Sequence, residues 1–376
     1  MKSKIWLSSP HMGGQEINFI HQAFDQNWIA PLGPNVTGFE QDLESYLKTD
    51  KKVGALSSGT SALHLALILA GVNQDDEVIC QSMTFSASAN PIKYLGATPI
   101  FVDSERLTFN ICPIALENAI IDRIKLGKTP KAIIAVHLYG MPFQVDKIVE
   151  ISKKYNIVLI EDAAEALGST FKNNFCGTFG DFAALSFNGN KIITTSGGGA
   201  IVSTKENTNQ AIFLATQARD NAPHYQHSTI GYNYRMSNIC AGIGRGQMLV
   251  LNSHIQARRN MNNFYLELFR NVKGIKVQQE PSVDYYSNFW LTAIVIDPNI
   301  LGKSALDLRL ALEKENIESR PLWKPMHLQP IFMDYPYYGS NIAEDLFLNG
   351  LCLPSGSNLT IEEKDRIKKT VTEFLQ

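Results

Sequence analysis

The sequence is poor in cysteine and contains no closely spaced cysteine pair. Its five cysteines, at positions 80, 112, 176, 240 and 352, are odd in number and lie far apart, with no Cys-x-x-Cys pair. This distribution argues against both a disulfide framework and a zinc site. We therefore expect no metal ion, and we expect the protein to reside in the reducing cytoplasm.

An excess of charge and a long apolar run are also lacking. The 34 Lys and Arg residues nearly balance the 36 Asp and Glu residues, so no nucleic-acid partner is expected. The basic pair Arg258-Arg259 lies in an expected long helix and is interpreted as part of a solvated face. No segment reaches the ~20 apolar residues of a membrane helix, and the first residues lack an apolar core of signal length. We therefore expect no membrane partner.

The chain is long and apolar enough for two domains, with 376 residues of which 44% are hydrophobic. Up to about residue 240, short apolar runs alternate with segments of helical periodicity. Strands are expected at residues 52–56, 77–80, 98–102, 132–136 and 155–160, and helices at 62–70, 114–124 and 145–154. This alternation predicts an α/β domain, residues 1–245, with a mostly parallel sheet covered on both faces.

The pattern changes in the last third of the chain. A periodic helix is expected at 246–269, strands at 275–277 and 291–296, and a helix at 306–314. A final helix follows Thr360, whose spacing from Glu363 is that of a capping box. These elements predict a smaller α+β domain, residues 246–376. Residues 223–231 read as a long loop, which in a compact domain tends to be functional.

An acid and a lysine in the first domain indicate a cofactor. Asp162 ends an apolar strand, and Lys191 follows 29 positions later beside small and polar residues. Pyridoxal phosphate needs a carboxylate beside its ring nitrogen and a lysine that holds its aldehyde as a Schiff base. Singly, such residues are more often a helix cap and a solvated surface group. Together they favour pyridoxal phosphate.

A second element offers a place for the phosphate of this cofactor. Residues 57–61 (SSGTS) lie between a short strand and a helix. A helix N-terminus binds anions through its unpaired N–H groups and its dipole. An ordinary helix cap is the alternative, but the pair Asp162 and Lys191 favours the phosphate site.

These motifs resemble the DegT/DnrJ/EryC1/StrS family, pyridoxal-phosphate-dependent aminotransferases of nucleotide-linked keto-sugars. The resemblance runs nearly end to end, through residues 31–34 (PLGP), 58–63 (SGTSAL), 84–87 (TFSA), 162–166 (DAAEA) and 231–236 (GYNYRM). Residues 186–199 and 320–327 are most similar to the bacillosamine-type branch, which aminates UDP-linked 4-keto-6-deoxy-N-acetylglucosamine. The resemblance implies the aspartate-aminotransferase-like architecture called fold type I, and L-glutamate as the amino donor.

The resemblance also implies roles for individual residues. Gly59, Thr60, Ser61 and Ser186 would hold the phosphate, Phe85 and Ala164 would pack on the two ring faces, Glu165 would lie near the phenolic oxygen, and Asn188 would line the cofactor. Asn233 would reach the phosphate of the partner subunit, which implies a homodimer with shared active sites. Without the resemblance, Asn233 would read as a turn residue and Phe85 as core.

Substrate contacts are expected from two further segments. The stiff loop at residues 321–327 offers Lys324 and His327 to a sugar nucleotide, and Tyr232 and Arg235 are additional candidates. The alternative for this loop is a packed turn with Trp323 in the core and Lys324 in solvent. The contacts of the donor carboxylate are not assigned.

The expected chemistry is transamination in two half-reactions. Lys191 would move a proton between the donor and the cofactor and later return one to the sugar, while Asp162 keeps the ring nitrogen protonated. A pyridoxal-phosphate-dependent dehydratase or lyase is an alternative, although relatives of that kind replace the lysine with histidine. A non-catalytic sugar-nucleotide sensor is another. A nicotinamide dehydrogenase is disfavoured, because the glycines at 197–199 lack the Gly-x-Gly-x-x-Gly turn.

Overall fold

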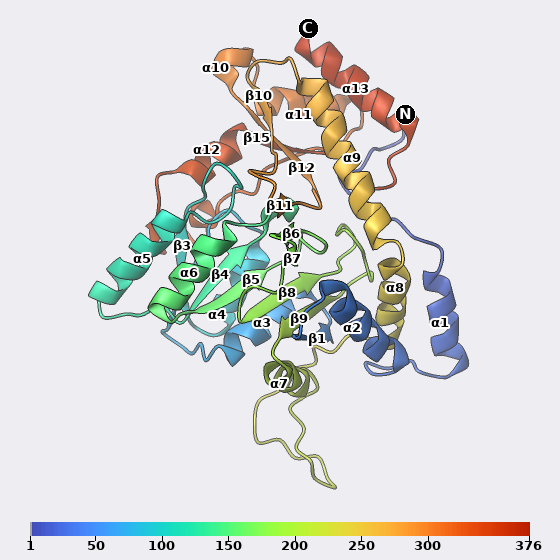
Figure 1. Cartoon of the computed structure of the whole chain (residues 1–376), viewed down its shortest axis with the longest axis vertical. Coiled ribbons are helices and arrows are strands. Elements are labelled where there is room, and N and C mark those ends of the chain that lie inside the picture. Colours follow the sequence, from blue (N-terminus) through green and yellow to red (C-terminus); the bar gives the residue numbers. More distant parts are fainter. Residues whose placement is uncertain (1) are drawn as a thin grey trace.

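A computed structural model describes residues 2–376, and its centre is an eight-stranded sheet (Figure 1). The strand order is β1 (Lys52–Leu56), β9 (Gly199–Ser203), β8 (Phe182–Ser186), β5 (Val158–Asp162), β4 (Ala132–Val136), β2 (Glu77–Gln81), β3 (Thr98–Val102) and β14 (Tyr337–Tyr338). From β8 to β14 all neighbours are parallel, whereas β9 is antiparallel to both β8 and β1. The mostly parallel sheet expected from the sequence is confirmed.

Helices cover both faces of this sheet, which explains why its strands are apolar on both faces. Ile134 of β4 packs in one cluster with α3 (Gly59–Leu69) and α7 (Lys205–Ala215). Its neighbour Ile133 packs on the other face with α5 (Pro113–Lys125) and α6 (Val145–Tyr155). Toward β1, the second face is covered by α2 (Pro34–Leu47). The central sheet is thus buried between two layers of helices.

The last third of the chain forms a smaller antiparallel sheet with helices. Its strand order is β10 (Ile275–Val277), β12 (Thr292–Ile296), β15 (Gly350–Leu353) and β13 (Arg320–Pro321). A separate core joins β10, β12 and β15 to α9 (Leu251–Phe269), α11 (Ala305–Lys314) and α13 (Ile361–Leu375). The capping box is confirmed, since Thr360 Oγ1 accepts from Glu363 N–H at 3.2 Å and Glu363 accepts from Thr360 N–H at 3.0 Å.

The remaining elements are short or lie at the periphery of the two sheets. They are α1 (Glu16–Asp25), α4 (Asn90–Tyr94), α8 (Asn238–Met248), α10 (Pro298–Leu301), α12 (Ile342–Asn349) and a small sheet of β11 (Tyr285–Tyr286), β6 (Thr170–Phe171) and β7 (Asn174–Phe175). The proposed domain boundary after residue 245 falls within α8. The division stays a prediction, and β14 shows that the last third of the chain also returns to the large sheet.

Two expected elements differ from those observed. The single helix expected at 246–269 is two helices, α8 and α9, separated at Leu249 and Val250, where Val250 has φ −112° and ψ 0°. The Val250 side chain lies against Gly13, and Gln247 donates to the His11 carbonyl at 2.9 Å. Docking of the N-terminal segment therefore accompanies the break. The strand expected at 155–160 begins only at Val158, because Tyr155 completes α6.

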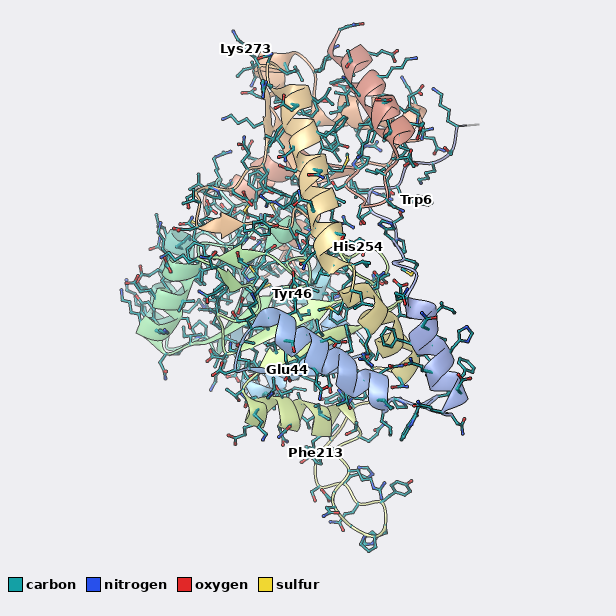
Figure 2. All side chains as sticks on the ribbon, turned by 45° about the vertical axis from the view of Figure 1, so that its right-hand side comes forward. Trp6, Glu44, Tyr46, Phe213, His254 and Lys273 are labelled. Atoms are coloured by element: carbon teal, nitrogen blue, oxygen red, sulfur yellow. The ribbon has the colours of Figure 1, made fainter. Side chains whose placement is uncertain are left out.

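The segment after α7 projects from the body of the molecule (Figure 1, Figure 2). It contains the long loop expected at 223–231, and the side chains of Tyr225 and Ile230 are about four-fifths exposed, at 80% and 82%. Within residues 2–376 the structure contains no helix with the length and apolarity that a bilayer crossing requires.

Candidate active site

A cavity of about 290 Å³ lies at the carboxyl ends of the central strands. Such strand ends are where open α/β sheets bind ligands. Asp162 ends β5, Ser186 ends β8, and Gly59 begins α3. Nine residues expected to contact the cofactor line this one cavity: Gly59, Thr60, Phe85, Asp162, Ala164, Glu165, Ser186, Asn188 and Lys191.

Asp162 is held by a chain of hydroxyl groups. Ser88 donates to Asp162 Oδ2 at 2.6 Å, and the Ala164 N–H donates to Oδ1 at 3.2 Å. Because the Ser88 proton is directed at the carboxylate, Thr84 donates in turn to Ser88 at 2.7 Å. The carboxylate is buried and oriented, as a group that must hold a ring N–H requires.

Lys191 lies in the loop after β8 and lines the cavity. Its Nζ is 3.4 Å from Glu165 Oε1 and 4.3 Å from the centre of the Trp290 ring, and its side chain is only 12% exposed. The amine therefore has one carboxylate and one aromatic face as neighbours. A largely buried amine in this setting suits proton transfer.

Glu165 is the second carboxylate of the cavity. Burial raises the pKa of Glu165, an effect that the nearby Lys191 amine opposes and the Asp162 charge reinforces. The Tyr139 N–H donates to Glu165 Oε2 at 2.7 Å. The carboxyl is thus fixed next to Lys191 with a raised pKa.

The N-terminus of α3 also lines the cavity. Ser58 caps the helix by accepting from the Ser61 N–H at 3.0 Å. The Ser61 hydroxyl is hydrogen-bonded to Ser57 and Ser58 and does not line the cavity, whereas Thr60 and Ser186 do. The β9 backbone lies close to the first residue of α3, since a Cβ on Gly199 would be 2.3 Å from the Gly59 nitrogen. This end offers hydroxyls and free helix N–H groups to an anion.

Besides Trp290, the aromatic side chains of Phe85 and Trp323 line the cavity, and only Phe85 was expected to contact the cofactor. Phe85 is 55% exposed, and its ring centre is 5.6 Å from that of Trp323. The Trp323 Nε1–H is buried and has no hydrogen-bond partner in the described chain. In the sequence analysis, Trp323 was a core residue in the alternative interpretation of the loop at 321–327. Ser88, Tyr139 and Trp290 were not predicted as site residues, and none of the three lies in a segment selected from the sequence.

The candidate substrate residues do not line the cavity. Tyr232 stacks on Tyr234, with ring centres 5.0 Å apart. Arg235 is ion-paired with Glu40, and Lys324 is exposed. His327 is 2.7 Å from the Ser82 hydroxyl, 3.2 Å from Glu344, and stacked on Tyr337. Their roles toward substrate stay predictions.

Asn233 is exposed and lies at the base of the projecting segment, in a β-bridge with Thr216. Its expected role is toward a partner subunit, so its absence from the cavity of its own chain agrees with that expectation without testing it.

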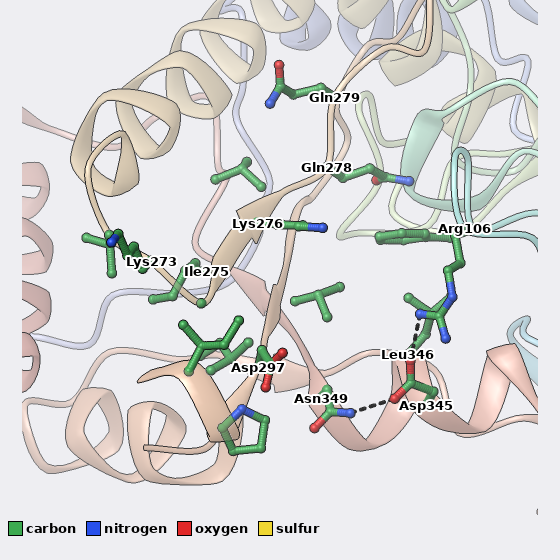
Figure 3. A pocket seen from close by; sticks show the side chains of 18 of the residues that line it. Arg106, Lys273, Ile275, Lys276, Gln278, Gln279, Asp297, Asp345, Leu346 and Asn349 are labelled. Atoms are coloured by element: carbon green, nitrogen blue, oxygen red, sulfur yellow. Dashed lines mark hydrogen bonds and ion pairs between the residues drawn. The ribbon is translucent and has the colours of Figure 1, made fainter. Parts of the chain in front are cut away.

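A larger cavity of about 840 Å³ lies elsewhere, between β10, the segment around Arg106 and α12 (Figure 3). Its lining includes Lys276 and the ion pair of Arg106 with Asp345, 2.7 Å apart. None of the residues expected to act on cofactor or substrate lines it. We assign the chemistry to the smaller cavity because that cavity joins a carboxylate, an amine and an anion-binding helix end.

These groups fit pyridoxal phosphate. Asp162 would hold the ring nitrogen, Lys191 the aldehyde carbon, and the α3 N-terminus with Thr60 and Ser186 the phosphate. Gly59 and Gly199 leave the backbone free to approach, and the exposed Phe85 ring is available for stacking. The fit rests on the donor set and on the close approach of β9 to α3.

Comparisons with known proteins agree with a pyridoxal phosphate site. Residues 10–372 match the model of the DegT/DnrJ/EryC1/StrS aminotransferase family. EpsN of Bacillus subtilis, provisionally named a pyridoxal phosphate-dependent aminotransferase, is 48% identical over 98% of this chain and 95% of its own. A GDP-perosamine synthase of Escherichia coli O157:H7 is 37% identical over 97% of both chains.

Solved structures of aminotransferases are also similar to this chain. The pyridoxal phosphate form of Spr1654 of Streptococcus pneumoniae, provisionally named a sugar aminotransferase, is 28% identical, with a TM-score of 0.88 over all of both chains. The expectations of fold type I, of a transferase and of pyridoxal phosphate as cofactor are therefore confirmed. The chain belongs to the DegT/DnrJ/EryC1/StrS family of sugar aminotransferases, which depend on pyridoxal phosphate.

Proposed function

We propose that this chain transfers the amino group of L-glutamate to a nucleotide-linked 4-keto-6-deoxy sugar. The sugar nucleotide that we favour is UDP-linked 2-acetamido-2,6-dideoxy-4-keto-hexose, and the product is its 4-amino derivative. The proposal of transamination is supported most directly by one observation. Lys191 Nζ, the Asp162 carboxylate and the α3 N-terminus lie around the same cavity.

Different residues of the chain have different roles in this reaction. Bound pyridoxal phosphate supplies the electron-accepting ring and the carbon that carries the amino group. Lys191 moves the proton between the substrate carbon and that carbon, because its amine is buried and held close to Glu165. Asp162, oriented by Ser88, keeps the ring nitrogen protonated.

The identity of the sugar is supported by two aromatic residues of the cavity lining and by the sequence of two loops. A 6-deoxy sugar presents an apolar methyl group, and Phe85 and Trp323 offer aromatic surface to such a face. Residues 186–199 and 320–327 support the UDP-linked N-acetyl sugar. The named GDP-perosamine synthase shows that the nucleotide differs among relatives, so the nucleotide must be tested directly.

We also propose that the active unit is a homodimer with shared sites. Asn233 is exposed beside a projecting segment and does not face the cavity of its own chain. A partner's Asn233 would then complete the phosphate site.

The substrate test compares two nucleotides. The protein, loaded with pyridoxal phosphate, is incubated with L-glutamate and either UDP-linked 4-keto-6-deoxy-N-acetylglucosamine or a GDP-linked 4-keto-6-deoxy sugar, and the products are weighed by mass spectrometry. We expect an amino sugar from the UDP substrate and none from a Lys191→Ala control. Turnover of the GDP sugar alone would overturn the nucleotide assignment. A product that has lost water without gaining nitrogen would favour a lyase.

A further inference from the structure

Arg258 of α9 is a buried cation that the cofactor chemistry leaves unexplained. The interpretation of Arg258-Arg259 as a solvated face is wrong for Arg258, whose side chain is 1% exposed. The neighbouring Arg259 is partly exposed and forms an ion pair with Glu280 at 2.6 Å. Side chains one position apart leave a helix in different directions, so one arginine faces inward and the other outward.

Arg258 has no carboxylate partner within ion-pairing distance anywhere in residues 2–376. Burial lowers the pKa of its guanidinium to about 9, which still leaves it charged at neutral pH. Its Nε–H also lacks an acceptor. A buried charge without a counter-ion is costly, and such departures from ordinary packing concentrate at functional sites.

The partners that Arg258 does have lead to Lys191. Nη1 donates to the Trp290 carbonyl at 2.6 Å, and Nη2 donates to Ser8 Oγ at 2.9 Å. Both of these residues then donate to the Asn190 carbonyl, Ser8 through its hydroxyl and Trp290 through Nε1–H, each at 2.7 Å. Asn190 directly precedes Lys191, and the Trp290 ring is the surface on which Lys191 Nζ lies.

The network also joins distant parts of the chain. Ser8 belongs to the N-terminal segment, Trp290 to the loop before β12, and the Ser355 carbonyl, 3.3 Å from Nη1, to the loop after β15. A planar guanidinium with several N–H groups at fixed angles can hold such a set, whereas a single ammonium cannot reproduce that geometry. Within residues 2–376, only Arg258 donates hydrogen bonds to both residues that donate to the Asn190 carbonyl.

We propose that Arg258 is a positioning residue for Lys191, which fixes Ser8 and Trp290 and through them the Asn190 carbonyl and the aromatic surface beneath the lysine amine. This inference rests on the proposed role of Lys191 in transamination. Arg258 does not line the candidate active-site cavity, so its effect must appear in the placement of Lys191 and in the rate of proton transfer.

The test compares Arg258→Met with the matched control Arg259→Met, which removes an arginine from the same helix and loosens the same loop through Ser287. Local opening is measured by hydrogen–deuterium exchange of residues 187–195 in the cofactor-free proteins. The rate of the glutamate half-reaction is then measured in a single turnover, through the loss of the visible band of the lysine-bound cofactor.

We expect Arg258→Met to speed exchange in residues 187–195 and to slow the half-reaction by about 10- to 100-fold, with little change in the glutamate concentration at half-saturation. Arg258→Lys should recover only part of the rate. Arg259→Met should leave both readouts within about twofold.

Equal effects of the Arg258→Met and Arg259→Met variants would overturn the proposal and make Arg258 merely structural. If Arg258→Met does not fold, Ser8→Ala serves instead, because it removes one donor to Asn190 and should slow the half-reaction by several-fold; an unchanged rate there would contradict the proposal. If the unmodified protein itself does not react with glutamate, the proposed function fails, and the exchange experiment still tests the role of Arg258.

Discussion

At the scale of residues, the cavity brings two carboxylates and one amine together away from bulk solvent. Asp162 has a hydroxyl and an N–H as donors, while Glu165 has the Tyr139 N–H and the Lys191 amine. The two acids therefore differ in surroundings although both are nearly inaccessible. This difference suits Asp162 to the ring nitrogen of the cofactor and Glu165 to the lysine amine.

The raised pKa of Glu165 predicts how stability depends on pH. The folded protein holds a proton on Glu165 at pH values where the unfolded carboxyl, with its ordinary pKa of 4.5, has lost it. The contribution of this group to stability is therefore present at low pH and is lost as the pH rises from 4.5 through the raised pKa. Glu165→Gln, which cannot ionise, should lack this loss.

The measurement is the urea midpoint of the cofactor-free protein and of Glu165→Gln between about pH 4 and pH 8. We expect the variant to gain stability relative to the parent as the pH rises. Parallel pH profiles for the two proteins would show that Glu165 does not carry a raised pKa.

The predictability of the site depended on where its residues lie along the chain. Asp162 ends an apolar strand and Lys191 lies in a recognisable motif, and together the two residues indicate the cofactor from the sequence. Ser88 and Trp290 contribute only because folding brings distant segments to the same cavity. Nothing in their immediate sequence distinguishes them from ordinary turn or core residues.

At the scale of elements, the site depends on the contact of β9 with the start of α3. A Cβ on Gly199 would lie 2.3 Å from the Gly59 nitrogen and also 2.3 Å from the Ser58 carbonyl carbon. Because those atoms belong to the backbone, they cannot turn aside as a flexible side chain would. The strand can approach the helix N-terminus only with glycine at this position.

Gly199→Ala should therefore push α3 away from β9, lowering the stability of the cofactor-free protein by about 1–3 kcal/mol and weakening its binding of pyridoxal phosphate. Gly197→Ala is the matched control, since a Cβ there would meet nothing within 4 Å. Its stability should change by no more than about 0.5 kcal/mol. Equal urea midpoints for the two variants would contradict this account of the contact.

Elements with their own hydrophobic period were predictable, and those set by distant packing were not. The strands at 77–80, 98–102 and 132–136 were expected from short apolar runs that the sheet buries on both faces. The break between α8 and α9 was not, because no proline or glycine marks Leu249 or Val250. The partner that accompanies this break, the N-terminal segment, lies more than two hundred positions away. The two-residue β14 is too short to show any period.

At the scale of the whole molecule, the proposal that Asn233 completes the phosphate site of a partner predicts that two copies share their sites. A mixture of Lys191→Ala and Asn233→Ala proteins tests this sharing. A mixed dimer would contain one intact site, made of Lys191 from one copy and Asn233 from the other. Activity absent or weak in each variant should therefore return after the subunits have exchanged. Mixed dimers that form without regaining activity would contradict the shared site.

The central claim is that Lys191 binds the cofactor and moves the proton. Its most direct test is the visible absorption spectrum of the purified protein with pyridoxal phosphate, recorded before and after L-glutamate, beside a Lys191→Ala variant. We expect a yellow band in the parent that glutamate bleaches, and no such lysine-dependent band in the variant. A parent without the band, or a variant that shows the same band and the same bleaching, would contradict the assignment of Lys191.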